Sequence, residues 1–261
     1  MKTFAIFGDP VAHSVSPILH NLAIKGLGIN ASYSRIAIPE GNELKNIFNR
    51  YNLDGVNVTV PHKETAYKLC DEIKGIAKDI QAVNTIVKLK NKLVGFNTDA
   101  AGFYQSVEQF KTDKVLILGA GGTARAIAYI LRLKNKDVTI LNRSETKLNS
   151  FEQNGFKTFS WKNFKMQKYD TVINTTSAGM KDNSYPLDYK ILEELLSNAK
   201  YAVDVIYNIE TPFLKLAKKY VEIKNGKDML LYQAVLAFNL FFNNRYDNEK
   251  IKEYMEQGFN L

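Results

Sequence analysis

Short apolar runs and amphipathic stretches alternate along the first part of the chain. Runs rich in branched apolar residues predict buried strands, and apolar positions at helical spacing predict helices. The expected strands cover residues 3–7, 32–38, 55–60, 85–89 and 92–96, and the expected helices cover residues 16–27, 42–51, 63–70 and 73–80. The polar pair Lys90-Asn91 separates the last two strands, which predicts a hairpin. Strands and helices in this alternation predict a mostly parallel sheet covered by helices.

The same alternation resumes after a helix that follows Asp99. The expected strands cover residues 115–118, 137–141, 170–174, 201–205 and 221–224, and the expected helices cover residues 124–133, 145–154, 189–196 and 212–220. Two last helices, at 229–243 and 248–257, are expected to fold back onto the first domain. The sequence therefore predicts a two-domain α/β protein, with one domain at 1–102 plus about 231–261 and the other at 103–230.

A glycine-rich turn lies between the first strand and the first helix of the second domain. Residues 119–124, Gly-Ala-Gly-Gly-Thr-Ala, match the dinucleotide pattern G-x-G-x-x-A. Gly119 permits a tight turn, Gly121 lets a pyrophosphate approach the backbone, and Ala124 lets the helix lie close to the strand. Free amides at the helix start bind phosphate. The strand before the turn and the helix after it distinguish this match from an ordinary glycine turn.

The residues after the next strand indicate which dinucleotide binds. An NAD site places an acidic residue on the ribose hydroxyl roughly 20 residues after the glycine turn. This chain has Asn142-Arg143-Ser144 at that place. A cation suits a 2′-phosphate and a carboxylate would repel it, so the sequence favours NADP over NAD.

Composition narrows the classes of partner. The chain has 261 residues, of which 45% are hydrophobic, and a formal charge of +8. Its 35 Lys and Arg residues are spread along the whole sequence, whereas a nucleic-acid-binding module needs them clustered on one face with aromatic residues. We therefore expect anionic small molecules as ligands. The single cysteine, Cys70, excludes an internal disulfide, and the absence of a C-x-x-C motif or a histidine-rich cluster argues against a metal site.

The sequence also predicts a cytoplasmic protein without a membrane partner. No signal peptide precedes Phe4, and the longest apolar stretch, residues 234–242, is interrupted by Asn239 and is too short to cross a bilayer. The three histidines, His13, His20 and His62, are scattered, which favours structural roles for them.

Polar clusters follow the strands of the first domain, where open α/β sheets bind ligands. Ser14 and Ser16 could bind a carboxylate, although Ser16 before Pro17 also fits a helix N-cap. Lys63 lies in the first turn of a helix, where a cation is mildly unfavourable, which suggests a role other than an ordinary surface lysine. Asp99 could be a helix cap, or it could pair with Lys63 for general acid–base catalysis.

Nine short motifs together carry a resemblance to a known family. They are GDPVAHSVSPILHN, NVTVPHK, AVNT, GFNTDAAGF, GAGGTARA, NRS, NTTSAGM, DVIYN and GKDMLLYQA. In this order, over nearly the whole chain, they resemble the shikimate dehydrogenase family. The resemblance implies NADPH-dependent reduction of 3-dehydroshikimate to shikimate, a step of aromatic amino acid biosynthesis. It also implies a two-domain α/β fold, with an N-terminal substrate domain, a Rossmann-type NADP domain and the active site in the interdomain cleft.

The resemblance implies a role for each matching residue. Lys63 and Asp99 correspond to the catalytic pair, and both also contact the substrate. The other substrate residues are Ser14 and Ser16 for the carboxylate, and Thr59, Asn84, Tyr207 and Gln233 for the ring and its hydroxyls. The cofactor residues are Gly119, Ala120, Gly121, Gly122 and Thr123 for the pyrophosphate, Asn142, Arg143, Ser144 and Lys147 for the adenosine phosphate, and Val205 and Gly226 for the nicotinamide.

Some positions depart from the family pattern, and other functions stay open. Ala100 stands where the family often has glycine, and Thr123 replaces a common alanine or serine. Lys147 replaces a frequent arginine, and lysine cannot make the bidentate contact of an arginine.

A quinate/shikimate dehydrogenase is the nearest alternative function. It would be favoured by the use of NAD, and Arg143 argues against NAD as the cofactor. A non-catalytic sensor of small acids is a distant one, and it predicts loss of Lys63 or Asp99. We expect a monomer or a homodimer.

Overall fold

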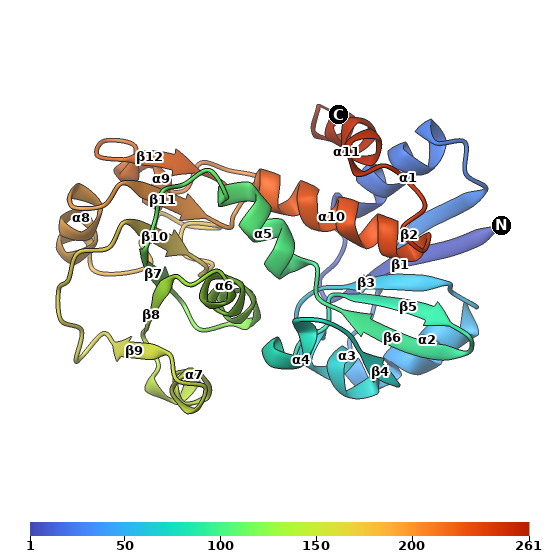
Figure 1. The fold of residues 1–261 in the computed structure, drawn as a ribbon, viewed down its shortest axis with the longest axis horizontal. Coiled ribbons are helices and arrows are strands. Elements are labelled where there is room, and N and C mark those ends of the chain that lie inside the picture. The colour runs from blue at the N-terminus through green and yellow to red at the C-terminus, as the bar shows by residue number, and fades with distance from the viewer. Residues whose placement is uncertain (261) are drawn as a thin grey trace. The chain divides into compact units, whose positions relative to one another are not determined.

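The computed structural model describes residues 1–260, which form two compact units. The first unit is Met1–Gly102 with the described residues from Leu231 onward, and the second is Phe103–Leu230. Each unit contains one six-stranded sheet with helices around it (Figure 1). The expected α/β class is confirmed.

The first sheet is mostly parallel, as predicted. Its strand order is β2-β1-β3-β5-β6-β4, and only β5 runs antiparallel to its neighbours. The strands are β1 (Lys2–Gly8), β2 (Ala31–Ala37), β3 (Gly55–Val58), β4 (Glu72–Ile73), β5 (Thr85–Leu89) and β6 (Lys92–Phe96). The predicted hairpin joins β5 and β6, with Lys90 and Asn91 at φ values of 48° and 65°. Two consecutive residues with positive φ are typical of the hairpin turns whose twist matches that of the flanking strands.

Helices cover both faces of this sheet. The helices of this unit are α1 (Ser16–Gly26), α2 (Leu44–Arg50), α3 (Lys63–Leu69), α4 (Ala77–Ile80) and α11 (Asn248–Glu256), with short 3₁₀ helices at Gly41–Glu43 and Gln257–Phe259. Two further helices, α5 (Asp99–Val107) and α10 (Lys227–Phe241), have residues in both units. One buried cluster joins Phe7 and Val56 of the sheet to Phe48 of α2. Toward the other face, Phe4 stacks on Phe241 of α10 with ring centres 4.7 Å apart.

The C-terminal helices pack back onto the first unit, as expected. Figure 1 shows α11 beside α1, and the two helices are in contact. Gly26 at the end of α1 faces the ring of Tyr254, and a Cβ there would lie 2.4 Å from it. Ile251 and Met255 of α11 are fully buried. The last segment of the chain is therefore part of the core of the first unit.

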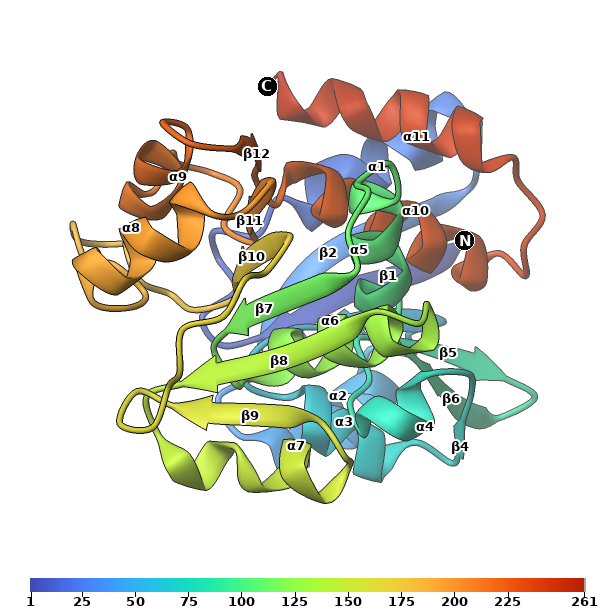
Figure 2. The ribbon, with the colours of Figure 1, turned by 60° about the vertical axis from the view of Figure 1, so that its left-hand side comes forward.

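The second sheet is entirely parallel, in the order β12-β11-β10-β7-β8-β9. Figure 2 shows β7, β8 and β9 side by side. The strands are β7 (Lys114–Leu118), β8 (Asp137–Asn142), β9 (Lys157–Ser160), β10 (Thr171–Asn174), β11 (Tyr201–Asp204) and β12 (Glu222–Lys224). The helices are α6 (Gly122–Leu133), α7 (Asn149–Gln153), α8 (Tyr189–Ser197) and α9 (Pro212–Ala217), with a 3₁₀ helix at Glu145–Lys147. The strand order reverses between β7 and β10, and ligands bind at such a point in open α/β sheets.

One predicted element was wrong in detail, and one strand was not predicted. The single helix predicted at residues 73–80 is strand β4 followed by the short α4, because Gly75 at φ +57° breaks the segment. Strand β9 was not predicted, since its sequence Lys-Thr-Phe-Ser has little apolar character. It pairs with β8 at the edge of the sheet, where one neighbouring strand suffices.

Within residues 1–260, no helix combines the length and the apolar character needed to cross a membrane.

Candidate functional site

Loops at the ends of β1 and β3 lie together in the first unit. The Asp9 amide donates to the Val60 carbonyl at 3.2 Å, and the Thr59 amide donates to the Phe7 carbonyl at 2.8 Å. A Cβ at Gly8 would lie 2.3 Å from the Thr59 methyl group, so glycine lets the two loops approach closely. The predicted substrate residue Thr59 is therefore held beside the end of β1.

Ser14 and Ser16 share one turn at the start of α1. The structure corrects the N-cap interpretation of Ser16, because Val15 occupies the cap position and Ser16 is the first helical residue. The Ser14 hydroxyl oxygen accepts the Ser16 amide at 3.3 Å, so Ser14 has a structural role that the sequence did not suggest. A serine hydroxyl that accepts a hydrogen bond keeps its own hydrogen to donate to a ligand.

Lys63 and Asp99 meet as an ion pair. Lys63 is the first residue of α3, Asp99 is the first residue of α5, and Lys63 Nζ lies 2.5 Å from Asp99 Oδ2. Their side chains are 17% and 11% exposed. The pair is therefore still accessible to solvent, but little water screens the attraction between its two charges. An ammonium and a carboxylate in this arrangement can hold and move a proton.

Asn84 contacts the other oxygen of Asp99. Its amide nitrogen donates to Asp99 Oδ1 at 2.8 Å and to Thr98 Oγ1 at 2.9 Å. Its amide oxygen accepts the Thr98 backbone amide at 2.8 Å. Both amide hydrogens of Asn84 thus have protein partners, and the bond to Asp99 orients that carboxylate. A substrate ring hydroxyl that accepts a hydrogen bond from Asn84 would compete with these two bonds.

The remaining predicted substrate residues belong to different units. Gln233 lies on α10 in the first unit, and a Cβ at Gly102 would lie 2.6 Å from its backbone nitrogen. Tyr207 follows β11 in the second unit, where burial raises the pKa of its phenol. The nearby Asp204 accepts the Ile206 amide at 3.0 Å, which holds the turn that carries Tyr207. Burial raises the pKa of Asp204 as well.

Val205 and Gly226, both predicted at the nicotinamide side, lie against each other. A Cβ at Gly226 would lie 2.1 Å from the Val205 carbonyl oxygen, and the Gly226 amide donates to the Ile206 carbonyl at 3.1 Å. Only glycine permits this approach of the two backbones. The contact joins the loop after β11 to the start of α10.

The predicted glycine turn connects β7 to α6. Gly119 has φ +110°, and a Cβ there would lie 2.6 Å from Thr175 Oγ1. Gly121 is the cap residue of α6 and offers no side-chain hydrogen bond to the first turn. Among residues 1–260, no atom outside the adjoining backbone lies within 4 Å of a Cβ placed at Gly121 or Gly122. The helix start therefore presents open backbone, as phosphate binding requires.

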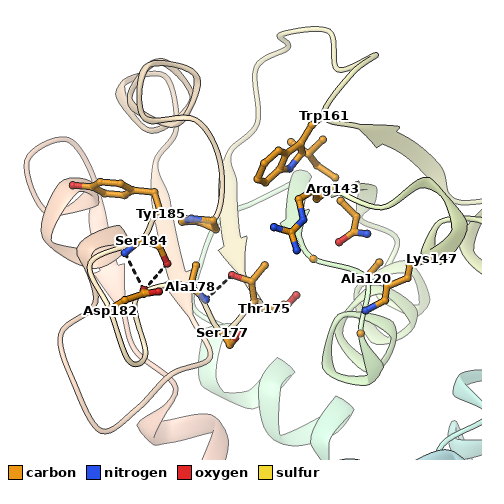
Figure 3. Close-up of a pocket in the computed structure, with 16 residues that line it drawn as sticks. Ala120, Arg143, Lys147, Trp161, Thr175, Ser177, Ala178, Asp182, Ser184 and Tyr185 are labelled. Atoms are coloured by element: carbon orange, nitrogen blue, oxygen red, sulfur yellow. Dashed lines mark hydrogen bonds between the residues drawn. The ribbon is translucent and has the colours of Figure 1, made fainter.

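A cavity of about 490 Å³ opens beside this turn (Figure 3). It is lined by the last residues of β8 and by residues that follow β7, β8, β9 and β10. The lining residues are Gly119, Ala120, Gly121, Leu141, Asn142, Arg143, Lys147, Trp161, Thr175, Thr176, Ser177, Ala178, Asp182, Ser184, Tyr185 and Pro186. It thus lies at the carboxyl ends of the strands, at the point where the strand order reverses.

The cavity fits a dinucleotide with a 2′-phosphate. Arg143 and Lys147 supply two cations, and the open Gly121 backbone suits a pyrophosphate. The position at the end of β8 carries Asn142, whose amide donates to the Ser144 carbonyl at 2.8 Å. Of the predicted cofactor residues, Gly119, Ala120, Gly121, Asn142, Arg143 and Lys147 line the cavity, whereas Gly122, Thr123, Ser144, Val205 and Gly226 lie outside its lining.

The sequence did not indicate Trp161 as a site residue. Trp161 follows directly after β9, and its ring centre lies 5.9 Å from the Arg143 guanidinium carbon. In Figure 3 the two side chains are adjacent, with Tyr185, Ser184 and Asp182 on the other side of the cavity. A correct prediction of β9 would have placed Trp161 at the same edge of the sheet as Arg143.

Two of the three histidines are buried in the first unit, as their scattered positions suggested. His62 Nε2 lies 2.6 Å from the Ile38 carbonyl, and His20 stacks on Tyr33. Across residues 1–260 no group of three or more His, Cys, Asp or Glu side chains could hold a metal ion.

Comparison with known proteins connects both units to one family. The family model described as "Shikimate dehydrogenase substrate binding domain" matches residues 6–86, and the model described as "Shikimate / quinate 5-dehydrogenase" matches residues 103–206. The chain is 45% identical to shikimate dehydrogenase (NADP(+)) of Helicobacter hepaticus, over 95% of this chain and 94% of that protein. It is 40% identical to shikimate dehydrogenase (NADP(+)) of Helicobacter pylori strain P12, over 99% of each.

The structure is also similar to a solved one. The crystal structure of shikimate 5-dehydrogenase from Thermus thermophilus, in complex with NADP(H) and shikimate, superposes with a TM-score of 0.86. The two sequences are 34% identical, and the match covers 99% of this chain and 100% of that one.

Proposed function

The chain belongs to the shikimate dehydrogenase family, and on this premise we propose that it interconverts 3-dehydroshikimate and shikimate with NADP as its cofactor. The observation that carries the proposal is the Lys63–Asp99 ion pair, because reduction of a ketone to an alcohol requires a proton donor at the oxygen. The cavity beside the glycine turn supports the choice of cofactor.

The mechanism assigns the proton to Lys63. Bound NADPH supplies the hydride. In reduction, Lys63 Nζ donates a proton to the oxygen that develops negative charge, and in oxidation Nζ accepts that proton. Asp99 holds the ammonium through its Oδ2, and Asn84 holds Asp99 through its Oδ1. The protein thus presents one oriented N–H bond to the reacting oxygen.

The proposed substrate residues belong to the first unit, except Tyr207, which belongs to the second. Ser14 and Ser16 donate hydroxyl hydrogens to the substrate carboxylate. The ring and its hydroxyls contact Thr59, Asn84, Tyr207 and Gln233. The turn that Ser14 and Ser16 share supports this assignment, since it holds two hydroxyl groups near the start of one helix.

The cofactor contacts follow the residues of the second unit. Gly119–Thr123 hold the pyrophosphate with backbone amides, and Asn142, Arg143, Ser144 and Lys147 bind the adenosine phosphate. Val205 and Gly226 pack beside the nicotinamide. On this proposal the first unit is the substrate domain, including the chain from residue 231 onward, and the second unit is the NADP domain.

The proposed cellular setting is the one that the sequence predicts. We place the enzyme in the cytoplasm, where a pool of NADPH supports biosynthesis. It acts on a small-molecule substrate as a monomer or a homodimer.

An assay at 340 nm tests the function. Shikimate and quinate are each offered with NADP⁺ and with NAD⁺, and we expect the highest kcat/KM for shikimate with NADP⁺. A preference for quinate or for NAD⁺ would favour a quinate/shikimate dehydrogenase, and no turnover of either acid would refute the proposal.

The same assay tests the mechanism. Lys63→Ala lowers kcat by a factor on the order of 10² to 10⁴, the usual worth of acid–base catalysis. Lys92→Ala is the matched control, because Lys92 forms an exposed ion pair with Glu72 in the same unit. An unchanged kcat in Lys63→Ala would remove this lysine from the reaction.

A further inference from the structure

Three buried polar side chains of the first unit have no role in the mechanism described so far. Tyr33, Asn57 and Thr85 are 4%, 6% and 0% exposed. They lie on β2, β3 and β5 and form a chain of hydrogen bonds that ends at Asn84, the residue that holds Asp99.

The direction of each hydrogen bond in this chain follows from one fixed donor. The Thr98 backbone amide can only donate, so the group of Asn84 that faces it is the carbonyl oxygen. The amide nitrogen of Asn84 must then be the group that faces Asp99. The Thr85 hydroxyl lies 3.0 Å from the Asn84 oxygen and donates to it.

The directions of the remaining hydrogen bonds, from Thr85 out to Tyr33, follow from that of the Thr85 hydroxyl. Because its hydrogen is directed to Asn84, the Thr85 oxygen accepts from Asn57 Nδ2, which lies 3.1 Å away. The Asn57 oxygen then faces the Tyr33 hydroxyl, which donates to it at 2.7 Å. Every donor from Tyr33 to Asn84 thus points toward Asp99. Hydrogen bonds aligned in one direction polarise each other and strengthen the last bond.

The outer end of the chain is closed to water. The Tyr33 ring stacks on His20 with ring centres 4.1 Å apart and an interplanar angle of 7°. His20 is 1% exposed, and burial lowers its pKa to about 3, so the imidazole stays neutral. His20 therefore places no charge beside Tyr33, whose hydroxyl donates to Asn57.

We propose that Tyr33, Asn57 and Thr85 are positioning residues that act through Asn84 to hold Asp99, and through it Lys63, in the reactive geometry. The inference rests on the proposed function. It predicts that loss of the Thr85 hydroxyl lowers kcat, because Asn84 loses the donor that fixes its amide and Asp99 gains freedom to rotate. A purely structural role predicts lower stability with kcat unchanged.

The test compares two buried threonines. Thr85→Val removes a hydroxyl from the chain, and Thr171→Val removes the buried hydroxyl that donates to Thr112 at 2.9 Å in the second unit. We expect Thr85→Val to lower kcat about ten- to a hundredfold, with the KM for NADP⁺ unchanged, and Thr171→Val to keep kcat within about twofold. Thr85→Ser restores the hydroxyl and returns kcat to within about threefold of the parent enzyme.

A second pair of variants covers the case in which Thr85→Val does not fold. Tyr33→Phe removes only the first donor of the chain, and Tyr169→Phe removes a buried phenol hydroxyl in the second unit. We expect kcat to fall several-fold in Tyr33→Phe and to stay unchanged in Tyr169→Phe. Equal kcat values within each pair, or failure of Thr85→Ser to restore kcat, would overturn the proposal.

A measurement independent of turnover separates this proposal from the proposed function. The ¹³C NMR signal of the Asp99 carboxyl carbon is assigned by its loss in Asp99→Asn. We expect Thr85→Val and Tyr33→Phe to shift this signal and Thr171→Val to leave it in place. An unmoved signal refutes the positioning role, whereas a shifted signal in an enzyme that does not oxidise shikimate refutes only the proposed reaction.

Discussion

At the scale of single residues, the proposed site assigns the choice of cofactor to a few side chains at the end of β8. Arg143 and Lys147 line the cavity as cations, and Asn142 occupies the end of the strand, where a carboxylate would repel a 2′-phosphate. Arginine binds phosphate through two parallel N–H donors, whereas lysine acts as a single point charge. Arg143 should therefore contribute most of the discrimination between NADP and NAD.

The variant Arg143→Ala tests whether Arg143 provides the discrimination between NADP and NAD. We expect the KM for NADPH to rise about ten- to a hundredfold, the usual worth of hydrogen bonds to a charged group, with the KM for NADH nearly unchanged. Steady-state kinetics with each cofactor measures both values, and Arg50→Ala, an exposed arginine of the first unit, is the control. Equal loss for both cofactors would mean that Arg143 does not contact the 2′-phosphate.

Trp161 offers a direct signal of cofactor binding. It is the only tryptophan in the chain, it lines the cavity, and it is 42% exposed beside Arg143. We expect adenosine 2′,5′-bisphosphate to quench its fluorescence, and Trp161→Leu to weaken binding of this ligand several-fold by calorimetry because Arg143 loses its aromatic neighbour. Unaltered fluorescence at saturating ligand would place the adenosine elsewhere.

At the scale of elements, one carboxylate connects three strands of the second unit. Asp170, just before β10, accepts the amides of Asp113 and Lys114 at 2.9 Å each, and its other oxygen lies 2.8 Å from Lys200 Nζ, just before β11. The bond from the Lys114 amide and the bond from Lys200 lower the pKa of Asp170 to about 2. Asp170 therefore stabilises the edge of the sheet at which β7, β10 and β11 begin.

The stability that Asp170 contributes depends on pH. Its pKa is lower in the folded state than in the unfolded chain, so its contribution is complete above about pH 4 and is lost as the pH falls toward about 2. We expect Asp170→Asn to cost about 1 kcal/mol at pH 7, since solvent screens a partly exposed pair, and to lower Tm by about 4 °C.

Thermal unfolding monitored by circular dichroism at several pH values measures this effect. The difference in Tm between the two proteins should narrow below about pH 4. Asp113→Asn is the control, because its side chain is 93% exposed and its ion pair with Lys136 spans 3.5 Å. A difference that stays constant down to pH 2 would argue against the lowered pKa.

At the scale of the whole molecule, the path of the chain makes one unit discontinuous. The first unit is completed only when the chain returns to it at Leu231, whereas the second unit is one continuous segment. Helix α11 buries Ile251 and Met255, and Gly258 after it faces Leu19 of α1, from which a Cβ would lie 2.8 Å away. Loss of the C-terminal segment should therefore affect the first unit selectively.

A truncation that removes residues 245–261 tests this dependence. We expect the first unit to unfold at a lower temperature, because α1 loses the apolar surface of α11. Trp161 fluorescence should still report binding of adenosine 2′,5′-bisphosphate, since Trp161 belongs to the second unit. Loss of that binding in the truncated protein would show that the second unit also requires the C-terminal helices.

Local pattern predicted most elements and failed at identifiable places. The unit β7-turn-α6 was predicted because an apolar strand, a glycine pattern and an amphipathic helix coincide within residues 114–133. Strand β9 and the break at Gly75 were missed, since a short edge strand and a single glycine leave a weak periodic signal. Most other differences are shifts of a residue or two at the ends of elements.

The sequence by itself determined the two alternating halves, the glycine turn and the cation after β8, because each depends on residues that are neighbours in the chain. The pairing of Lys63 with Asp99 was implied only by the family resemblance. Only the tertiary structure decided that Lys63 lies 2.5 Å from Asp99 and that the buried donors from Tyr33 to Asn84 lead to that carboxylate. The order β2-β1-β3-β5 brings these residues together from distant parts of the sequence. Contacts between strands depend on this order, and no local pattern encodes it.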